Sequence, residues 1–447
     1  MNLDDVLQLQ QPLATGGIRA INFFNGRLLT GKDLSREQAG RREADARLGL
    51  AIGDGVAFGL EVSRDAAKDV PAAPVLRIKA GLAINRLGQT LRLAADSSVA
   101  LTRRFDSSSP ECVFVNCNPI GDGVYVAGAG VYVLTIAPAQ IGEGKAPTNG
   151  LDPANVRCST DAVVEAVQFR LLSINPLRFA DLGPGSTQFR NRLAYRCFGI
   201  EAREQGGLDP WRVDPPRYGL VDELRAVGLD DRDVPLGLVY WTVDGIQFVD
   251  TWAVRRRLLA PDALSGYSFQ RDPLLPEELS SFSFLARRRR LVEAHAMCAQ
   301  FQQHLADLLA AAANPATVIA AQHFRYLPPF GIVPLQTAPL RGFFEPQFFA
   351  GIVRRPPPGV GQSTEFIDVR LLGTLQELAL AGSPTDLTQR EFVWVYRPWQ
   401  NVRAAVEGQP VQPTVAFASG LLPPLSIARF DMARYDYSNY ADCCSGP

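Results

Sequence analysis

The chain has 447 residues, of which 47% are hydrophobic and 20% charged. This is ordinary globular composition, and it excludes disorder as the dominant state. Its 45 basic and 46 acidic residues leave a net charge of −1, which excludes the basic field over the whole surface that is typical of nucleic-acid-binding proteins.

The N-terminal part predicts a capped helix followed by a strand. Thr30 can cap the helix, and Asp33 stands three residues later as a variant capping box. The helix is expected to end at Gly53. Steps of three and four residues give this mostly polar helix a thin apolar seam at Leu34, Gln38, Arg41, Ala44, Leu48 and Ile52. Strand alternation with one buried face follows at Val56, Phe58, Leu60 and Val62.

A small β unit is expected next. Apolar residues alternate at Leu76, Ile78, Ala80, Leu82 and Ile84. A turn around Gly88 leads into a return strand, and a further strand follows it, with apolar positions at Leu91, Leu93, Val99 and Leu101. The block therefore combines one helix with several short strands.

The middle of the chain, residues 106 to about 270, predicts mainly strands. The strongest are residues 113–115, 125–126, 131–136, 163–172 and 238–249. A shorter helix is expected over residues 188–197. A cluster of carboxylates at Asp230, Asp231 and Asp233 has the residue types of a Ca²⁺ or Mg²⁺ site, but without an EF-type loop we interpret it as a polar turn.

Residues 273–325 form a predicted long helical segment, in which the helix opens at Pro276 and Glu277 and Asn314-Pro315 stops it. One face of this helix carries Leu291, Ala294, Cys298, Phe301, Leu305 and Leu308. Beyond it, strands are expected at residues 366–372, 392–396, 414–418 and 428–432. The predicted fold class is therefore α+β and β-rich, built of several units.

The sequence contains no motif for catalysis, a cofactor or a metal. The seven Cys form no CxxC pair, and irregular spacing with only three His excludes a structural zinc site of ordinary spacing. Glycosidase carboxylates meet only in three dimensions, so a pair of them stays open. The adjacent Cys443 and Cys444 are interpreted as part of a tail without special chemistry.

Membrane and nucleic-acid partners are not expected. The N-terminus has no apolar signal region, and the longest uncharged stretch, residues 124–142, alternates as a strand does. The sequence predicts a soluble protein that is made in a reducing compartment and whose thiols are mostly buried. The basic runs 255–257 and 287–290 lack interleaved aromatic residues, so we interpret them as packed or solvated helix turns.

The C-terminal tail has the composition of an interface. Tyr435, Tyr437 and Tyr440 stand among Asp and Asn residues, and protein interfaces favour Tyr and Arg. Ordinary packing is the alternative interpretation of these tyrosines. The near-neutral charge of the chain permits association between copies, since little repulsion keeps them apart.

The N-terminal block also resembles a known family. FFNGRLLTGKDL, then REQ, RR, LGLAIGDGVAFGLEV and GLAINRLGQTLRL, is similar to the opening of tail or baseplate-associated proteins of extracellular contractile injection systems, which are phage-tail-like particles. This chain has Asn85 where Asp is common in that family, and Ala57-Phe58 where a more polar pair is usual. Later stretches such as HFRYLPPFGIVPL and EFVWVYRPWQNV are similar in style.

The resemblance implies a structural component that is peripheral to the baseplate, in a cage or fibre-like position, with no catalytic residues to transfer. The expected function is that of a baseplate-associated structural subunit, not an enzyme. It needs no cofactor, assembles with other particle subunits and forms a homo-oligomer. It is made in the cytoplasm and becomes part of a particle that is extracellular after release. The alternatives are a tail-borne glycan hydrolase and a receptor-binding tail fibre.

We expect four units, with the docking surface in the first. They are an N-terminal helix-plus-β docking module (1–105), a β-rich domain (106–272), a long helical segment (273–325) and a C-terminal β-rich domain with the interface tail (326–447). The candidate docking and interface residues are Phe23, Phe24, Leu28, Leu29, Leu34, Phe58, Leu60, Tyr435, Tyr437 and Tyr440.

Overall fold

A computed structural model describes twelve stretches of the chain. They are residues 17–65, 74–101, 130–148, 157–200, 219–258, 277–313, 318–334, 365–367, 369–380, 384–388, 393–398 and 414–419. The predicted strands at 113–115, 125–126 and 428–432 lie outside these residues, as do Tyr435, Tyr437, Tyr440, Cys443 and Cys444. The described residues form helices and several largely antiparallel sheets, which confirms the α+β, β-rich fold class.

The N-terminal block consists of one helix and six short strands. They are α1 (Gly31–Ile52), β1 (Gly55–Gly59), β2 (Val62–Arg64), β3 (Val75–Ile78), β4 (Gly81–Ile84), β5 (Thr90–Leu93) and β6 (Ser97–Ala100). The strands form two antiparallel sheets, with the orders β1-β4-β5 and β2-β3-β6. The capped helix and the turn at Gly88 are therefore where the sequence predicts them.

Each of two predicted strands of this block is divided between the two sheets. The run from Val56 to Val62 becomes β1 and β2, and the run from Leu76 to Ile84 becomes β3 and β4. Gly59 and Leu60 both adopt positive φ, so the chain bends there from one sheet into the other. Beside this bend, the Leu60 N–H donates to the Ala80 carbonyl, so both runs change sheets at the same place. Alternation alone cannot show such a bend, because burial continues on both sides of it.

The central layer is a four-stranded antiparallel sheet with the order β10-β9-β7-β8. Its strands are β7 (Gly130–Thr148), β8 (Arg157–Ile174), β9 (Val234–Thr242) and β10 (Gly245–Asp250). The predicted single strand 238–249 is thus a hairpin, since Gly245 with φ 102° allows a tight turn. The next helices are α2 (Phe189–Cys197) and α3 (Leu220–Arg225), and α2 confirms the predicted short helix.

Both faces of the central sheet are buried. Val131 and Val133 pack with α2, α3 and α4 residues in one hydrophobic cluster. Leu134 and Ile136, on the opposite face, pack with residues of the N-terminal sheets from Val56 to Leu101. One core is therefore shared by residues on both sides of position 105.

In the C-terminal part, another four-stranded sheet packs against the long helix α4 (Glu277–Ala311). This sheet has the order β12-β16-β15-β13. The remaining elements are α5 (Ala320–His323), β11 (Tyr326–Leu327), β12 (Phe330–Pro334), β13 (Glu365–Ile367), α7 (Val369–Ala379), β14 (Thr385–Asp386), β15 (Val393–Pro398) and β16 (Thr414–Ser419). The predicted apolar face of α4 is confirmed where it is described, since Ala294, Cys298, Phe301 and Leu305 are buried.

The predicted strand 366–372 is wrong beyond its first two residues. The strand β13 ends at Ile367, and the helix α7 begins at Val369. Leu375 and Ala379 are buried four residues apart, which is the period of a helix. The short apolar run was consistent with either structure, and the helical period downstream decides it.

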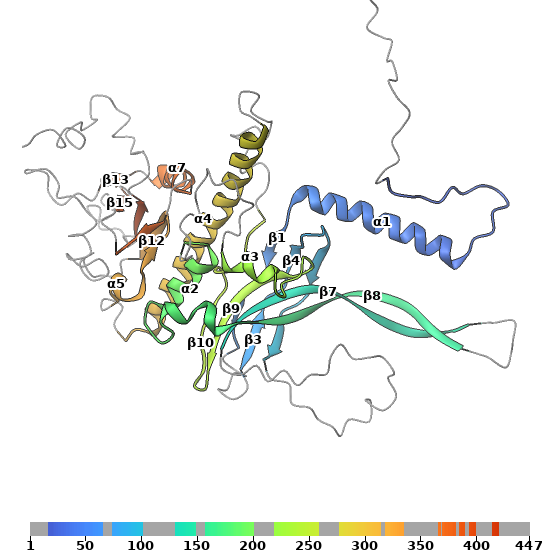
Figure 1. Cartoon of the computed structure of the whole chain (residues 1–447), viewed down its shortest axis with the longest axis horizontal. Coiled ribbons are helices and arrows are strands. Elements are labelled where there is room, and N and C mark those ends of the chain that lie inside the picture. The colour runs from blue at the N-terminus through green and yellow to red at the C-terminus, as the bar shows by residue number, and fades with distance from the viewer. Residues whose placement is uncertain are drawn as a thin grey trace, which may run out of the picture.

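Two elements project from the body in the same direction (Figure 1). One is α1, which is about 33 Å long at 1.5 Å per residue. The other is the distal part of the paired strands β7 and β8. We call it the ribbon, residues 137–148 and 157–168, because the pairing of β7 with β9 stops at Ile136.

Candidate docking surface of the N-terminal block

The start of α1 is fixed by its cap. The Asp33 backbone N–H donates to the Thr30 hydroxyl, and the Asp33 carboxylate accepts from the Thr30 backbone N–H. Arg27 forms an ion pair of 2.9 Å with the same carboxylate. Hydrogen bonds from Thr30, followed by those from Arg27, lower the pKa of Asp33. The predicted capping box is therefore confirmed.

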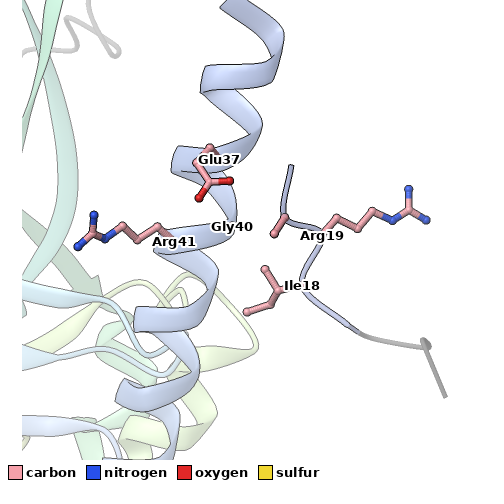
Figure 2. A pocket seen from close by; sticks show the side chains of 6 residues that line it. Ile18, Arg19, Glu37, Gly40 and Arg41 are labelled. Carbon is pink, nitrogen blue, oxygen red and sulfur yellow. The ribbon is translucent and has the colours of Figure 1, made fainter. Parts of the chain in front are cut away.

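The segment before the helix folds back along it. We call residues 17–30 the N-terminal strap. Ile21 of the strap is buried, and its backbone N–H donates a long hydrogen bond of 3.5 Å to Glu37. An open hollow of about 330 Å³ lies between strap and helix, lined by Ile18, Arg19, Ala20, Glu37, Gly40 and Arg41. Figure 2 shows Arg41 on the opposite side of α1 from Ile18 and Arg19.

The chemistry of this hollow does not favour the hydrolase hypothesis. Glycosidases of the common kind use two carboxylates, about 5–10 Å apart. The lining of the hollow contains one carboxylate, that of Glu37, and two arginines. The hollow is therefore a gap between two packed segments rather than a place where two acids converge.

The C-terminal end of α1 is seated on the β4–β5 turn. Gly49 is the one buried residue of α1, and a Cβ built on it would lie 2.0 Å from the Gly88 carbonyl oxygen. Gly88 has a φ of 77°, and a Cβ built on it would lie 1.9 Å from the Ala46 carbonyl oxygen. Such a contact between two backbones needs glycine on both sides. The helix is thus fixed at its last turn and extends away from the body.

Most of the predicted docking residues lie at the surface. Phe23, Phe24, Leu28, Leu29 and Leu34 have exposed fractions of 49–86%, and Phe58 is also exposed. Burying one such side chain contributes roughly 1.5–3 kcal/mol, so a cluster of them in water is unusual for a monomer. The surface is therefore suited to contact with another protein.

Leu60 is a correction to the predicted docking set. It is fully buried, together with Val56 and Val62. A register irregularity between Val56 and Phe58 breaks the simple alternation. As a result Phe58 faces solvent, whereas the other residues predicted on the same face are buried. Leu60 therefore belongs to the core and offers no side chain to a partner.

The seam predicted along α1 is present but uncovered. Leu34, Leu48 and Ile52 share one helical face, since their spacings of 14 and four residues are close to whole turns of 3.6 residues. All three side chains are exposed. We call these residues the apolar stripe of α1. A helix in a globular protein ordinarily buries such a stripe against its own core.

The ribbon is a second surface with uncovered apolar residues. Ile141 pairs with Val164, Gly142 pairs with Val163, and all three large side chains are exposed. A two-stranded ribbon alone is at best marginally stable in water. The predicted strand 163–172 includes part of the β8 half of the ribbon, whereas the predicted strand 131–136 stops just before the β7 half begins.

The remaining chemical candidates of the sequence analysis have structural surroundings. Asp233 is buried and accepts hydrogen bonds from Thr135 and Arg170, so the acidic cluster is a turn fixed to the sheet, as interpreted. Cys197 and Cys298 are buried free thiols, and burial raises the pKa of each to about 12. The expectation of buried thiols is confirmed for these two residues.

A buried ionic centre at Asp250 is absent from the sequence predictions. One carboxylate oxygen of Asp250 accepts from Arg190 at 2.9 Å and from Gln300 at 2.8 Å, and the other accepts from the Ala253 backbone. Arg190 reaches on to Asp307 at 2.7 Å. These contacts join β10, α2 and α4. The signal available in the sequence was its Arg content, since 41 of the 45 basic residues are Arg and Arg suits buried pairs. This content does not indicate which Arg is buried.

Two comparisons with known proteins find no match. The chain matches no model of a known protein family. It also matches no curated protein. Within the described stretches, no three His, Cys, Asp or Glu side chains gather as a metal site would require. No helix in those stretches is both long enough and apolar enough to cross a membrane.

Proposed function

We propose that this chain is a structural subunit of a contractile injection system, associated with the baseplate and acting through assembly with other subunits of the particle. It is made in the cytoplasm and becomes part of a particle that is extracellular after release. The proposal combines the resemblance of the N-terminal block with the exposure of its apolar residues.

One observation carries the proposal. The large apolar residues of the FFNGRLLTGKDL segment are exposed, although such residues are usually found in cores. Several exposed large apolar side chains within one short segment are typical of a protein–protein contact. The same segment carries the resemblance to the baseplate-associated family. The residues on which the resemblance rests are therefore also exposed for contact with another subunit.

The test replaces the apolar side chains of the N-terminal strap and leaves the core intact. In the variant Phe23→Ser/Phe24→Ser/Leu28→Ser, we expect incorporation into particles to fall by about tenfold or more, since interface anchors of this size commonly contribute 2 kcal/mol or more. The measurement is mass spectrometry of particles purified from producing cells. Unchanged thermal unfolding of the isolated variant shows that it still folds.

A matched control removes exposed apolar residues elsewhere. Leu177 and Val243 are 78% and 85% exposed, and both lie outside the N-terminal block. The variant Leu177→Ser/Val243→Ser should enter particles normally. Full incorporation of the strap variant, or equal losses in both variants, would contradict the proposal.

A further inference from the structure

We propose that the partner of α1 is a second copy of this chain. The apolar stripe of α1 in one copy packs on the Val163 face of the ribbon in the other copy, and the reverse contact forms at the same time. This inference deepens the proposed function, on which it rests, because it names a partner for the N-terminal docking surface.

The α1 side of this contact is apolar and basic. Arg41 lies on the same helical face as Leu34 and Leu48, by the 100° turn per residue of a helix. It is exposed and makes no hydrogen bond or ion pair within the described stretches. Residues 17–52 contain seven basic and four acidic side chains, so this projecting part carries a charge of +3.

The Val163 face of the ribbon carries one exposed apolar side chain between two carboxylates, while Ile141 and Val164 lie on the opposite face. Strand alternation places Asp161, Val163 and Glu165 on one face of β8, and all three are exposed. Neither carboxylate has a hydrogen bond or ion pair in the described part of the chain. The ribbon, residues 137–148 and 157–168, contains three acidic side chains and two basic ones, so it carries a charge of −1.

The two surfaces therefore complement each other in both polarity and charge. Arg41 stands among Leu and Ile side chains, while Asp161 and Glu165 flank Val163. Opposite charges around apolar centres favour encounter and fix the register of a contact. Because one chain carries both surfaces, two copies related by a two-fold axis can form the contact twice.

The stripe is not positioned to close on the ribbon of its own chain. Gly49 and Gly88 fix the last turn of α1 at backbone contact, and Asp54 beyond the helix pairs with Arg86 of the same turn at 3.5 Å. From this fixed end α1 and the ribbon leave the body as separate projections (Figure 1). A second copy supplies the missing surface without unseating the helix.

The faces of the ribbon suit this contact better than its edges do. On β7, Pro138 lacks the N–H that an added strand would need, and Gly144 has a φ of 70°. On β8, antiparallel pairing between two copies centred on Val163 would place Asp161 opposite Glu165. That arrangement brings like charges together, so docking of a helix on the face is favoured over pairing of two β8 edges.

Charge reversal on the purified full-length chain tests the inference. The wild-type chain should have the native mass of a dimer. Arg41→Glu alone and Glu165→Arg alone should each weaken the dimer by about tenfold or more. An equimolar mixture of the two variants should dimerise again, because each copy then meets a partner of opposite charge at both contacts. The double variant should also dimerise.

The control reverses a charge away from both surfaces. Arg232 is exposed and its side chain makes no hydrogen bond or ion pair within the described residues, so Arg232→Glu should leave the dimer unchanged. The inference is overturned by a wild-type monomer, by single variants that still dimerise, or by a mixture that does not recover. Particle incorporation is measured separately, so a chain that dimerises as expected but is absent from particles contradicts only the proposed function.

Discussion

At the scale of single residues, His304 shows how burial decides the chemistry of a side chain. Its ring packs against Phe324 with centroids 4.7 Å apart, and its Nδ1 has no hydrogen-bond partner among the residues that the structure describes. Burial, followed by the charges of Arg190 and His323, lowers the pKa of His304 well below 6.5. The imidazole is therefore neutral in the folded chain at neutral pH and behaves as an aromatic core residue.

This gives stability a dependence on pH. Below pH 6.5 the unfolded chain binds a proton at His304 that the folded chain does not bind, so the free energy of unfolding falls as the pH falls toward the lowered pKa. The slope from this residue is at most about 1.4 kcal/mol per pH unit. His304→Phe should reduce the loss between pH 6.5 and pH 5.5, measured by urea unfolding. Equal losses in variant and wild type would show that His304 does not carry the effect.

At the scale of elements, the contact of α1 with the β4–β5 turn changes the expected effect of replacing a helix glycine by alanine. Replacing a glycine within an exposed helix by alanine usually stabilises the helix by about 1 kcal/mol. At Gly49 the added Cβ would meet the backbone of Gly88, which has no flexible side-chain end that can move away. To accommodate this Cβ without distorting its own backbone, α1 must move away from the Gly88 turn.

We therefore expect Gly49→Ala to destabilise the attachment of α1. Hydrogen exchange of the Gly88 turn should become at least several-fold faster in this variant, because its backbone loses the helix that covers it. Gly31→Ala, at the other end of the same helix, meets no atom within 4 Å and should leave exchange at the turn unchanged. Equal exchange at the turn in Gly49→Ala and the wild type would contradict the tight seat.

The sequence predicted local elements better than their mutual placement. Thr30, Asp33 and Gly53 define α1 through chemistry within a few residues, and the structure confirms both ends. Leu60 was misassigned because its bend depends on contacts with Ala80 and with the buried Arg255, whose guanidinium donates to the Gly59 carbonyl. Whether another part of the chain covers the apolar stripe of α1 depends on the rest of the fold. Helical periodicity in the sequence carries no information about that placement.

At the scale of the whole molecule, Asp250 connects parts of the chain that are distant in sequence. Its partners lie 60 residues before it and 50 residues after it. Arg190 and Asp250 are 8% and 1% exposed. Removing Asp250 leaves the buried Arg190 with Asp307 as its remaining ion-pair partner and leaves Gln300 and the Ala253 N–H without their acceptor. Breaking a buried pair of this kind costs up to about 3–5 kcal/mol.

Asp250→Ala should lower the free energy of unfolding by that amount, about 3–5 kcal/mol, measured by urea unfolding at pH 7. Glu43→Ala is the matched control, because Glu43 forms an exposed ion pair with Arg47 within α1. Such pairs contribute at most about 0.5 kcal/mol. Similar small losses in both variants would mean that the Asp250 centre contributes no more than a surface pair.

The shared core of the N-terminal and central sheets has a consequence for synthesis. Val56 and Leu76 pack with Leu236 and Val249, which leave the ribosome much later. At 5–20 residues per second, the nascent N-terminal strands wait roughly eight to forty seconds for these partners. During that interval FFNGRLLTGKDL and the unfinished sheets are exposed together, a state in which chaperones protect growing chains from aggregation. Deleting residues 1–105 would remove one wall of this core, so point substitutions separate docking from folding where the deletion cannot.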